Sequence, residues 1–143
     1  MYKHAAWLPA ALLCAVAGCS GDNSDLDHAS APLTADLETG ARIYSGYCVA
    51  CHQEDARGIP EVYPSLAGSP VVLGDPKELA LWVIKGVRPA SLPPGRYPTN
   101  MRQFGWMKAQ DAAALFTYLR SHFGNAGSAV DAAAIEQALG DGE

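Results

Sequence analysis

Two cysteines and a histidine stand together in Cys48-Val49-Ala50-Cys51-His52, and this pattern constrains the fold more than any other feature of the chain. The segment reads C-x-x-C-H, the signature of covalent attachment to c-type haem. Two thiols three positions apart on a helical turn reach the two vinyl groups of one porphyrin. The adjacent imidazole is then carried under the ring, where it can ligate iron. The motif therefore predicts a fold built around one haem.

The two cysteines are open to three other interpretations. A thioredoxin-like dithiol needs a βαβ surrounding, whereas this neighbourhood has the pattern of helices. A structural zinc site needs four ligands, and beyond the motif and the N-terminal segment only His28 and His122 remain, neither at zinc-finger spacing. A disulfide between Cys48 and Cys51 is the third alternative. An export signal upstream favours haem attachment over all three.

Residues 1–18 have the organisation of a secretory signal peptide, because Lys3 precedes an apolar run that ends in small residues. The run is shorter than the roughly 20 apolar residues that a membrane-spanning helix needs. It ends at Val16-Ala17-Gly18-Cys19, which resembles the lipobox of bacterial lipoproteins. We therefore expect a lipid anchor on Cys19 and a place on the periplasmic side of a bacterial membrane. Ser20 after the cysteine resembles an outer-membrane sorting signal. The alternative is an ordinary signal peptide with Cys19 as a stray thiol.

The charge balance bears on the class of partner. The chain has 15 acidic and 10 basic side chains among 143 residues, for a net charge of −5, and we find no cluster of Lys or Arg. Nucleic acid is therefore excluded as a partner, because neutralising phosphates needs a concentrated basic face. With 49% apolar residues, the chain has enough to bury one core and form one compact domain.

Composition and periodicity divide the rest of the chain. Residues 19–33 are small and polar, without periodicity, and are expected to form a flexible tether that includes His28. Residues 34–124 form the domain, and residues 125–143 form a C-terminal extension with a short helix. Capping residues and apolar spacing predict helices near residues 34–47, 75–85, 109–123 and 131–139, and no convincing strand pair.

Together these residues resemble class I monohaem cytochrome c over about residues 34–124. The resemblance is carried by Gly40 and Tyr44 ahead of the motif, by Pro64-Ser65-Leu66-Ala67-Gly68, by a loop methionine and by the helix around 115–120. A narrower resemblance is to cytochrome subunits that accept electrons from periplasmic dehydrogenases, through Ser69-Pro70, 101–106 and Phe123-Gly124-Asn125. The resemblance implies an all-α, cytochrome c-like fold of three to five helices wrapped around one covalently attached haem.

The same resemblance implies the remaining site residues. A methionine from a loop supplies the sixth iron ligand, and we favour Met101, in the proline-rich loop, over Met107, which stands where apolar side chains more often fill the core. The Pro64 carbonyl accepts a hydrogen bond from the His52 imidazole, and Leu66 packs on the haem. By their place in the sequence, three arginines lie in or beside the loop expected to cover the haem edge, where one of them pairs with a haem propionate or all are solvated: Arg88, Arg96 and Arg102.

His52 and Met101 together leave no open position on the iron, so the expected chemistry is one-electron transfer and not catalysis. The expected donor is a dehydrogenase, and the expected acceptor is a terminal oxidase or another cytochrome. Two alternatives from other classes are a haem enzyme such as a peroxidase and a sensor of small gas ligands. Carbon monoxide binding to the reduced protein separates these from an electron carrier, because both need an open iron position.

Overall fold

The computed structural model describes residues 24–92, 94–98 and 100–140. Within these residues the regular structure is helical, apart from an isolated bridge between Ile59 and Tyr63. The predicted all-α class is therefore confirmed. The helices outnumber the three to five expected because two of them are single turns. In order they are α1 (Ser24–Tyr47), α2 (Val49–His52), α3 (Pro70–Leu73), α4 (Pro76–Ala80), η1 (Leu81–Lys85), α5 (Ala109–Ser121) and α6 (Ala132–Gly140).

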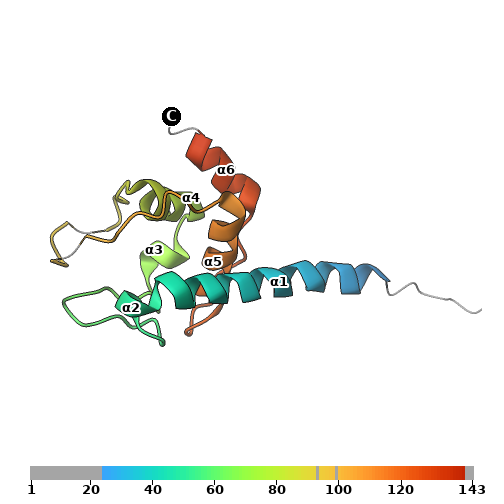
Figure 1. The fold of residues 1–143 in the computed structure, drawn as a ribbon, viewed down its shortest axis with the longest axis horizontal. Helices are drawn as coiled ribbons and strands as arrows, with labels where there is room; N and C mark the ends of the chain where they lie inside the picture. Colours follow the sequence, from blue (N-terminus) through green and yellow to red (C-terminus); the bar gives the residue numbers. More distant parts are fainter. Residues whose placement is uncertain (1–23, 93, 99, 141–143) are drawn as a thin grey trace, which may run out of the picture.

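The fold is organised around the packing of α1 against α5, two helices far apart in the sequence (Figure 1). Gly40 makes the close approach possible, because a Cβ there would lie 2.6 Å from the Cβ of Tyr118 and closer still to the Ala114 carbonyl oxygen. One turn further along α1, the Tyr44 ring packs on the rings of Tyr118 and Phe123, with centroid separations of 5.9 and 5.1 Å.

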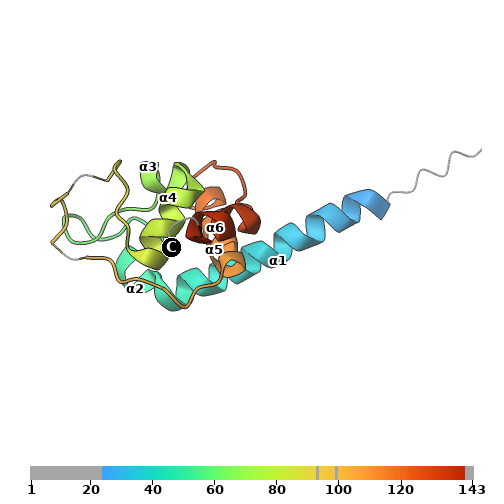
Figure 2. The ribbon, with the colours of Figure 1, turned by 90° about the horizontal axis from the view of Figure 1, so that it is seen from above.

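The beginning of α1 differs from the expectation. The helix starts at Ser24, not at Thr34, so ten residues that we expected in an aperiodic tether are helical. Residues 24–33 contain no glycine, and the helix continues through Pro32 although proline disfavours helix interiors. The first turns of α1 project beyond the rest of the fold (Figure 2). The expected signal peptide and Cys19 lie outside the described residues.

The helical segment that follows α3 begins and ends as the sequence indicates. The Asp75 side chain accepts a hydrogen bond from the Lys77 N–H at 2.9 Å, and Pro76 occupies the first turn. Gly86 ends the segment in the left-handed region at φ 77°. The unexpected feature is η1, a π-helical turn, in which the Gly86 N–H donates to the Leu81 carbonyl. The last helices also match the expectation, since α5 and α6 lie within two residues of their predicted bounds.

The C-terminal extension is tied to the domain through buried groups. Ile135 on α6 is fully buried, and α6 packs on both α4 and α5. Arg120 on α5 is buried and donates to the carbonyl oxygens of Val72 at 2.8 Å, Gly74 at 2.9 Å and Ser128 at 2.9 Å. This one side chain therefore joins α3, α5 and the segment that leads to α6.

Candidate functional site

The motif Cys48 to His52 lies where α1 ends and the chain turns into α2. The Cys48 N–H continues the helical pattern by donating to the Tyr44 carbonyl at 2.9 Å, and the His52 N–H closes the next turn onto the Cys48 carbonyl at 2.8 Å. Both thiols are free and half-buried. Burial, together with the neighbouring Cys51, raises the pKa of the Cys48 thiol to about 11. The two cysteines and the histidine are therefore presented from one continuous turn of backbone.

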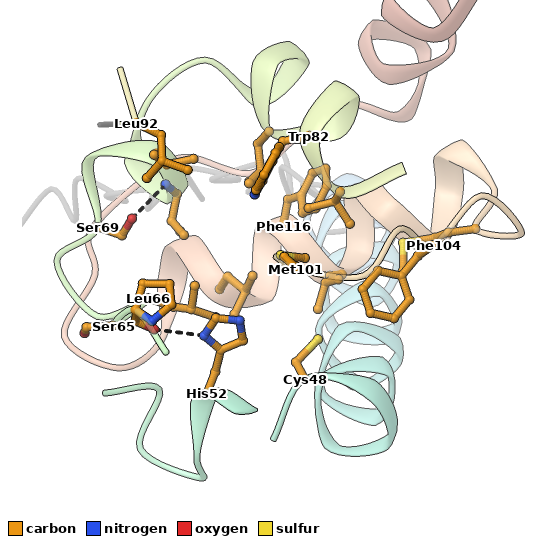
Figure 3. Close-up of a pocket in the computed structure, with 18 residues that line it drawn as sticks. Cys48, His52, Ser65, Leu66, Ser69, Trp82, Leu92, Met101, Phe104 and Phe116 are labelled. Atoms are coloured by element: carbon orange, nitrogen blue, oxygen red, sulfur yellow. Dashed lines mark hydrogen bonds between the residues drawn. The ribbon is translucent and has the colours of Figure 1, made fainter. Parts of the chain in front are cut away.

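The His52 imidazole is buried and its tautomer is fixed by one contact. Its Nδ1 lies 2.9 Å from the Pro64 carbonyl oxygen, shown as a dashed line in Figure 3. A carbonyl can only accept, so Nδ1 carries the proton and Nε2 keeps its lone pair. Burial lowers the pKa of His52, although the Pro64 hydrogen bond opposes it, and this favours the neutral ring that metals bind. The predicted contact between His52 and Pro64 is confirmed.

The loop that carries Pro64 is fastened to the last long helix by Asn125. Its Nδ2 donates to the carbonyls of Leu119 at 2.7 Å and Leu66 at 3.2 Å, while its Oδ1 accepts from the Gly68 N–H at 2.7 Å. Asn125 is buried. In the sequence this residue stands only as the end of the segment Phe123-Gly124-Asn125, which carries the narrower resemblance. Its three hydrogen-bond partners explain why the loop holds a defined position next to His52.

Two apolar cavities meet around His52, with volumes of about 80 and about 300 Å³. Leu66 lines the smaller and Cys51 the larger. No Asp or Glu is among the described residues that line either one. The residues common to both walls are Cys48, His52, Pro64, Trp82, Leu92, Met101 and Phe104.

The two candidate methionines occupy different environments. Met101 lies in irregular backbone, 36% exposed, on the wall of both cavities. Figure 3 shows it across the space from the His52 ring. Met107 is buried at 4% exposure and belongs to the core, although it also touches the smaller cavity. The placement of Met107 in the core is as predicted.

These residues fit a haem. The thiols of the motif, the Nε2 lone pair of His52 and the thioether of Met101 border the larger cavity, which suits a flat hydrophobic ring whose iron takes an imidazole and a thioether ligand. The described residues include no group of three or more His, Cys, Asp or Glu side chains that could hold a metal ion. Within the same described ranges, no helix has both the length and the apolar character for a membrane crossing.

Trp82 is a site residue that no motif in the sequence indicates. Its indole lines both cavities, and the Arg88 guanidinium lies 5.5 Å from its ring centroid. The π-helical turn η1 carries it, and such turns are frequent at functional sites.

Comparison with known proteins agrees with this geometry. The family model described as cytochrome c matches residues 37–123. The chain is 30% identical to cytochrome c-552 of Thermus thermophilus over 92 residues, which are 61% of this chain and 70% of that protein. It is 30% identical over 128 residues to the fructose dehydrogenase cytochrome subunit of Gluconobacter japonicus, covering 85% of this chain and 26% of that subunit.

A third relative is the cytochrome c subunit of the quinone alcohol dehydrogenase of Gluconacetobacter polyoxogenes. The identity is 31% over 115 residues, which are 74% of this chain and 24% of that subunit. The chain thus spans about a quarter of the length of the two dehydrogenase subunits.

Proposed function

We propose that this chain, which belongs to the cytochrome c family and carries one covalently attached haem, transfers single electrons with His52 and Met101 as its iron ligands. The observation that supports the ligand set is the Nδ1 hydrogen bond of His52 to Pro64, which reserves Nε2 for a metal on a cavity that Met101 also lines. The haem supplies a reversible Fe(II)/Fe(III) couple, and two protein ligands leave it no vacant position.

The protein residues supply attachment, orientation and exclusion of water. Cys48 and Cys51 hold the haem through thioether bonds, and the Pro64 carbonyl orients the His52 ring and raises its basicity as a ligand. Leu66 and the other apolar walls keep water from the iron. Soft methionine ligation in an apolar pocket favours the less charged ferrous state, so the reduction potential lies above that of a bis-histidine haem.

Replacing the proposed methionine ligand tests the assignment. In Met101→Ala, loss of the axial thioether opens an iron position, so the ferric spectrum changes from low-spin to high-spin and the reduced protein binds carbon monoxide. Absorption and magnetic circular dichroism spectra measure both changes. Met107→Leu, which preserves core volume, is the control and keeps the wild-type spectrum. A Met101→Ala protein that stays low-spin and does not bind carbon monoxide would contradict the ligand set. Rapid carbon monoxide binding by the reduced wild type would favour an enzyme or a sensor.

We further propose that the protein is anchored by lipid at Cys19 on the periplasmic side of a bacterial membrane, with the outer membrane as the expected location. Anchoring raises encounter rates by confining donor and acceptor near one surface.

The relatives named as cytochrome subunits of fructose and alcohol dehydrogenases support a dehydrogenase as the donor. The acceptor is a terminal oxidase or another carrier. Copurification with a dehydrogenase from native membranes tests the partner, and purification as a lone chain under mild conditions would argue against a stable complex.

A further inference from the structure

The π-helical turn η1 makes one backbone carbonyl available to a segment far along the chain. In a regular α-helix the Val87 N–H would pair with the Val83 carbonyl, four residues earlier. Here the Val87 N–H donates to the Leu81 carbonyl at 3.1 Å. The Val83 carbonyl accepts instead from the Phe104 N–H at 2.9 Å. The widened turn therefore joins η1 to the segment that carries Met101.

Phe104 is held in place through its backbone and its side chain. Besides the N–H bonded to Val83, its carbonyl accepts from the Met107 N–H at 2.9 Å, and its side chain is 5% exposed. The Phe104 side chain also lines both cavities, as Met101 does. Phe104 is therefore a fixed point of the backbone between the proline-rich loop and α5.

Met101 lies three residues before this fixed point. Three residues of extended chain span at most about 11 Å, so the position of Phe104 limits where the Met101 thioether can lie. The chain on the other side of Met101 gives less support, because residues 94–96, 98 and 100 are exposed. The Met101 side chain is therefore positioned mainly from the direction of Phe104.

A second contact joins the same two segments at Gly86, which ends η1 with φ 77°. A Cβ on Gly86 would lie 3.0 Å from the Gln103 Cγ and closer still to its Nε2. The bare backbone of Gly86 thus leaves room for the side chain next to Phe104. Trp82, on the same turn, lines both cavities and lies with Met101 across from His52 (Figure 3). One short element therefore supplies part of the cavity wall and supports the segment beside it.

We propose that η1 is a positioning element for the sixth iron ligand. Gly86 and the Val83 carbonyl hold residues 101–104 so that the Met101 thioether stays on the iron. The inference rests on the proposed function, because it takes Met101 as the ligand, and it adds residues outside the ligand set. Gly86 is a positioning residue, since replacing it changes how often the thioether leaves the iron and not which atoms bind.

The rate at which an external ligand reaches the iron measures this hold. Imidazole added to the ferric, haem-loaded protein binds only after the Met101 thioether has left. The rate constant at saturating imidazole is therefore the rate constant of thioether dissociation. An iron–sulfur bond breaks and an iron–nitrogen bond forms, with no change of oxidation state. Stopped-flow absorbance follows the exchange.

Two glycine variants with similar backbone strain separate positioning from stability. Gly86→Ala puts a Cβ on a left-handed residue and against Gln103, and we expect it to raise the dissociation rate constant by about tenfold. Gly124→Ala also strains a left-handed residue, at φ 80°, but its Cβ meets nothing within 4 Å. Both variants should lower Tm, whereas Gly124→Ala should change the rate constant by less than about twofold. Equal rate constants in the two variants would overturn the proposal.

A change of a single backbone group tests the hydrogen bond itself. Replacing Phe104 by its α-hydroxy analogue substitutes an ester oxygen for the N–H and keeps the side chain. Loss of the bond to Val83 is expected to raise the dissociation rate constant by about fivefold. The control is the α-hydroxy analogue of Leu73, whose N–H donates to the Ser69 carbonyl at 2.9 Å, and it should leave the rate constant unchanged. An unaltered rate constant in the Phe104 ester would contradict the role of this bond.

Hydrogen exchange tests the contact in the unaltered protein. The Phe104 amide of the reduced, haem-loaded protein is expected to exchange with solvent deuterium more slowly than the amide of exposed Gly105. Nuclear magnetic resonance follows both amides. Equal exchange rates would overturn the proposal even if Gly86→Ala failed to fold.

The Met101→Ala variant keeps this proposal distinct from the proposed function. If Met101→Ala stays low-spin, the ligand set itself fails, and the role of η1 fails with it. If Met101→Ala becomes high-spin and Gly86→Ala exchanges its ligand as slowly as Gly124→Ala, only the positioning role of η1 fails.

Discussion

Tyr44 contributes both to the contact between α1 and α5 and to the position of the motif Cys48 to His52. Its ring is buried between α1 and α5, and its hydroxyl donates to the Gln53 carbonyl at 2.5 Å, immediately after His52. Burial, followed by the nearby Cys48 and Tyr118, raises the pKa of Tyr44 well above its ordinary value of 10.0. The neutral phenol is therefore the form that the folded protein requires.

Tyr44→Phe tests this requirement. Loss of the hydrogen bond is expected to lower the free energy of unfolding by about 1 kcal/mol at neutral pH. Because the folded pKa is raised, the stabilisation linked to this proton is complete below about pH 10 and is lost as pH rises further. Urea unfolding at pH 7 and pH 11 should show a smaller loss at high pH in Tyr44→Phe than in the wild type. Tyr47→Phe, at an exposed position, is the control, and an identical pH dependence in all three proteins would contradict the assignment.

The sequence predicted some site residues and not others, for a physical reason. Cys48, Cys51 and His52 lie within five consecutive residues, so one motif identifies all three. Arg120 and Asn125 act on backbone carbonyls and an N–H that distant segments contribute, and backbone groups leave no mark in a sequence. Only the fold shows that these two side chains connect the loop that carries Pro64 and the C-terminal extension to α5.

At the scale of elements, the crossing of α1 and α5 depends on the missing side chain of Gly40. Gly40→Ala forces its Cβ against the Ala114 backbone, so we expect it to lower the free energy of unfolding by about 1 to 3 kcal/mol or more. Gly46, two turns along the same helix, has no neighbouring atom within 4 Å of an added Cβ. Gly46→Ala should instead stabilise the protein by about 0.5 to 1 kcal/mol. Thermal unfolding measures both, and a tolerated Gly40→Ala would exclude a steric role.

Element types were predicted better than element boundaries. Asp75, Pro76 and Gly86 mark the ends of one helical segment by their own conformational preferences, and the structure agrees. The start of α1 and the π-helical turn η1 have no comparable local signal. Helix extension depends on small differences in propensity between neighbouring residues, and a π-turn depends on packing against the rest of the fold.

At the scale of the molecule, Arg120 joins parts that are remote in sequence. Arg120→Met leaves the carbonyls of Val72 and Gly74 without this donor, so we expect the free energy of unfolding to fall by about 2 to 4 kcal/mol. The haem spectrum should not change, because no iron ligand is altered. Arg42→Met on the exposed face of α1 should cost less than about 0.5 kcal/mol. Urea unfolding followed by circular dichroism compares the two variants. Equal unfolding midpoints for Arg120→Met and Arg42→Met would show that Arg120 does not hold these segments together.

The proposed attachment to a membrane is also tested on the whole molecule. Cys19→Ala is expected to move the protein from the membrane fraction to the soluble periplasmic fraction, because it removes the proposed site of lipid attachment. Cys14→Ala changes the other cysteine of the N-terminal segment and should leave the distribution as in the wild type. Fractionation and immunoblotting measure the partition. Membrane retention of Cys19→Ala would show that another element anchors the protein.

The pairing of α1 with α5 also bears on how the protein is made. A chain that leaves the ribosome N-terminus first presents Cys48, Cys51 and His52 long before α5 has been synthesised. The helix contact that closes the core needs both ends of the domain, and such long-range contacts form late. Haem attachment can thus act on an open polypeptide, and the bound porphyrin is then the surface on which the later helices condense.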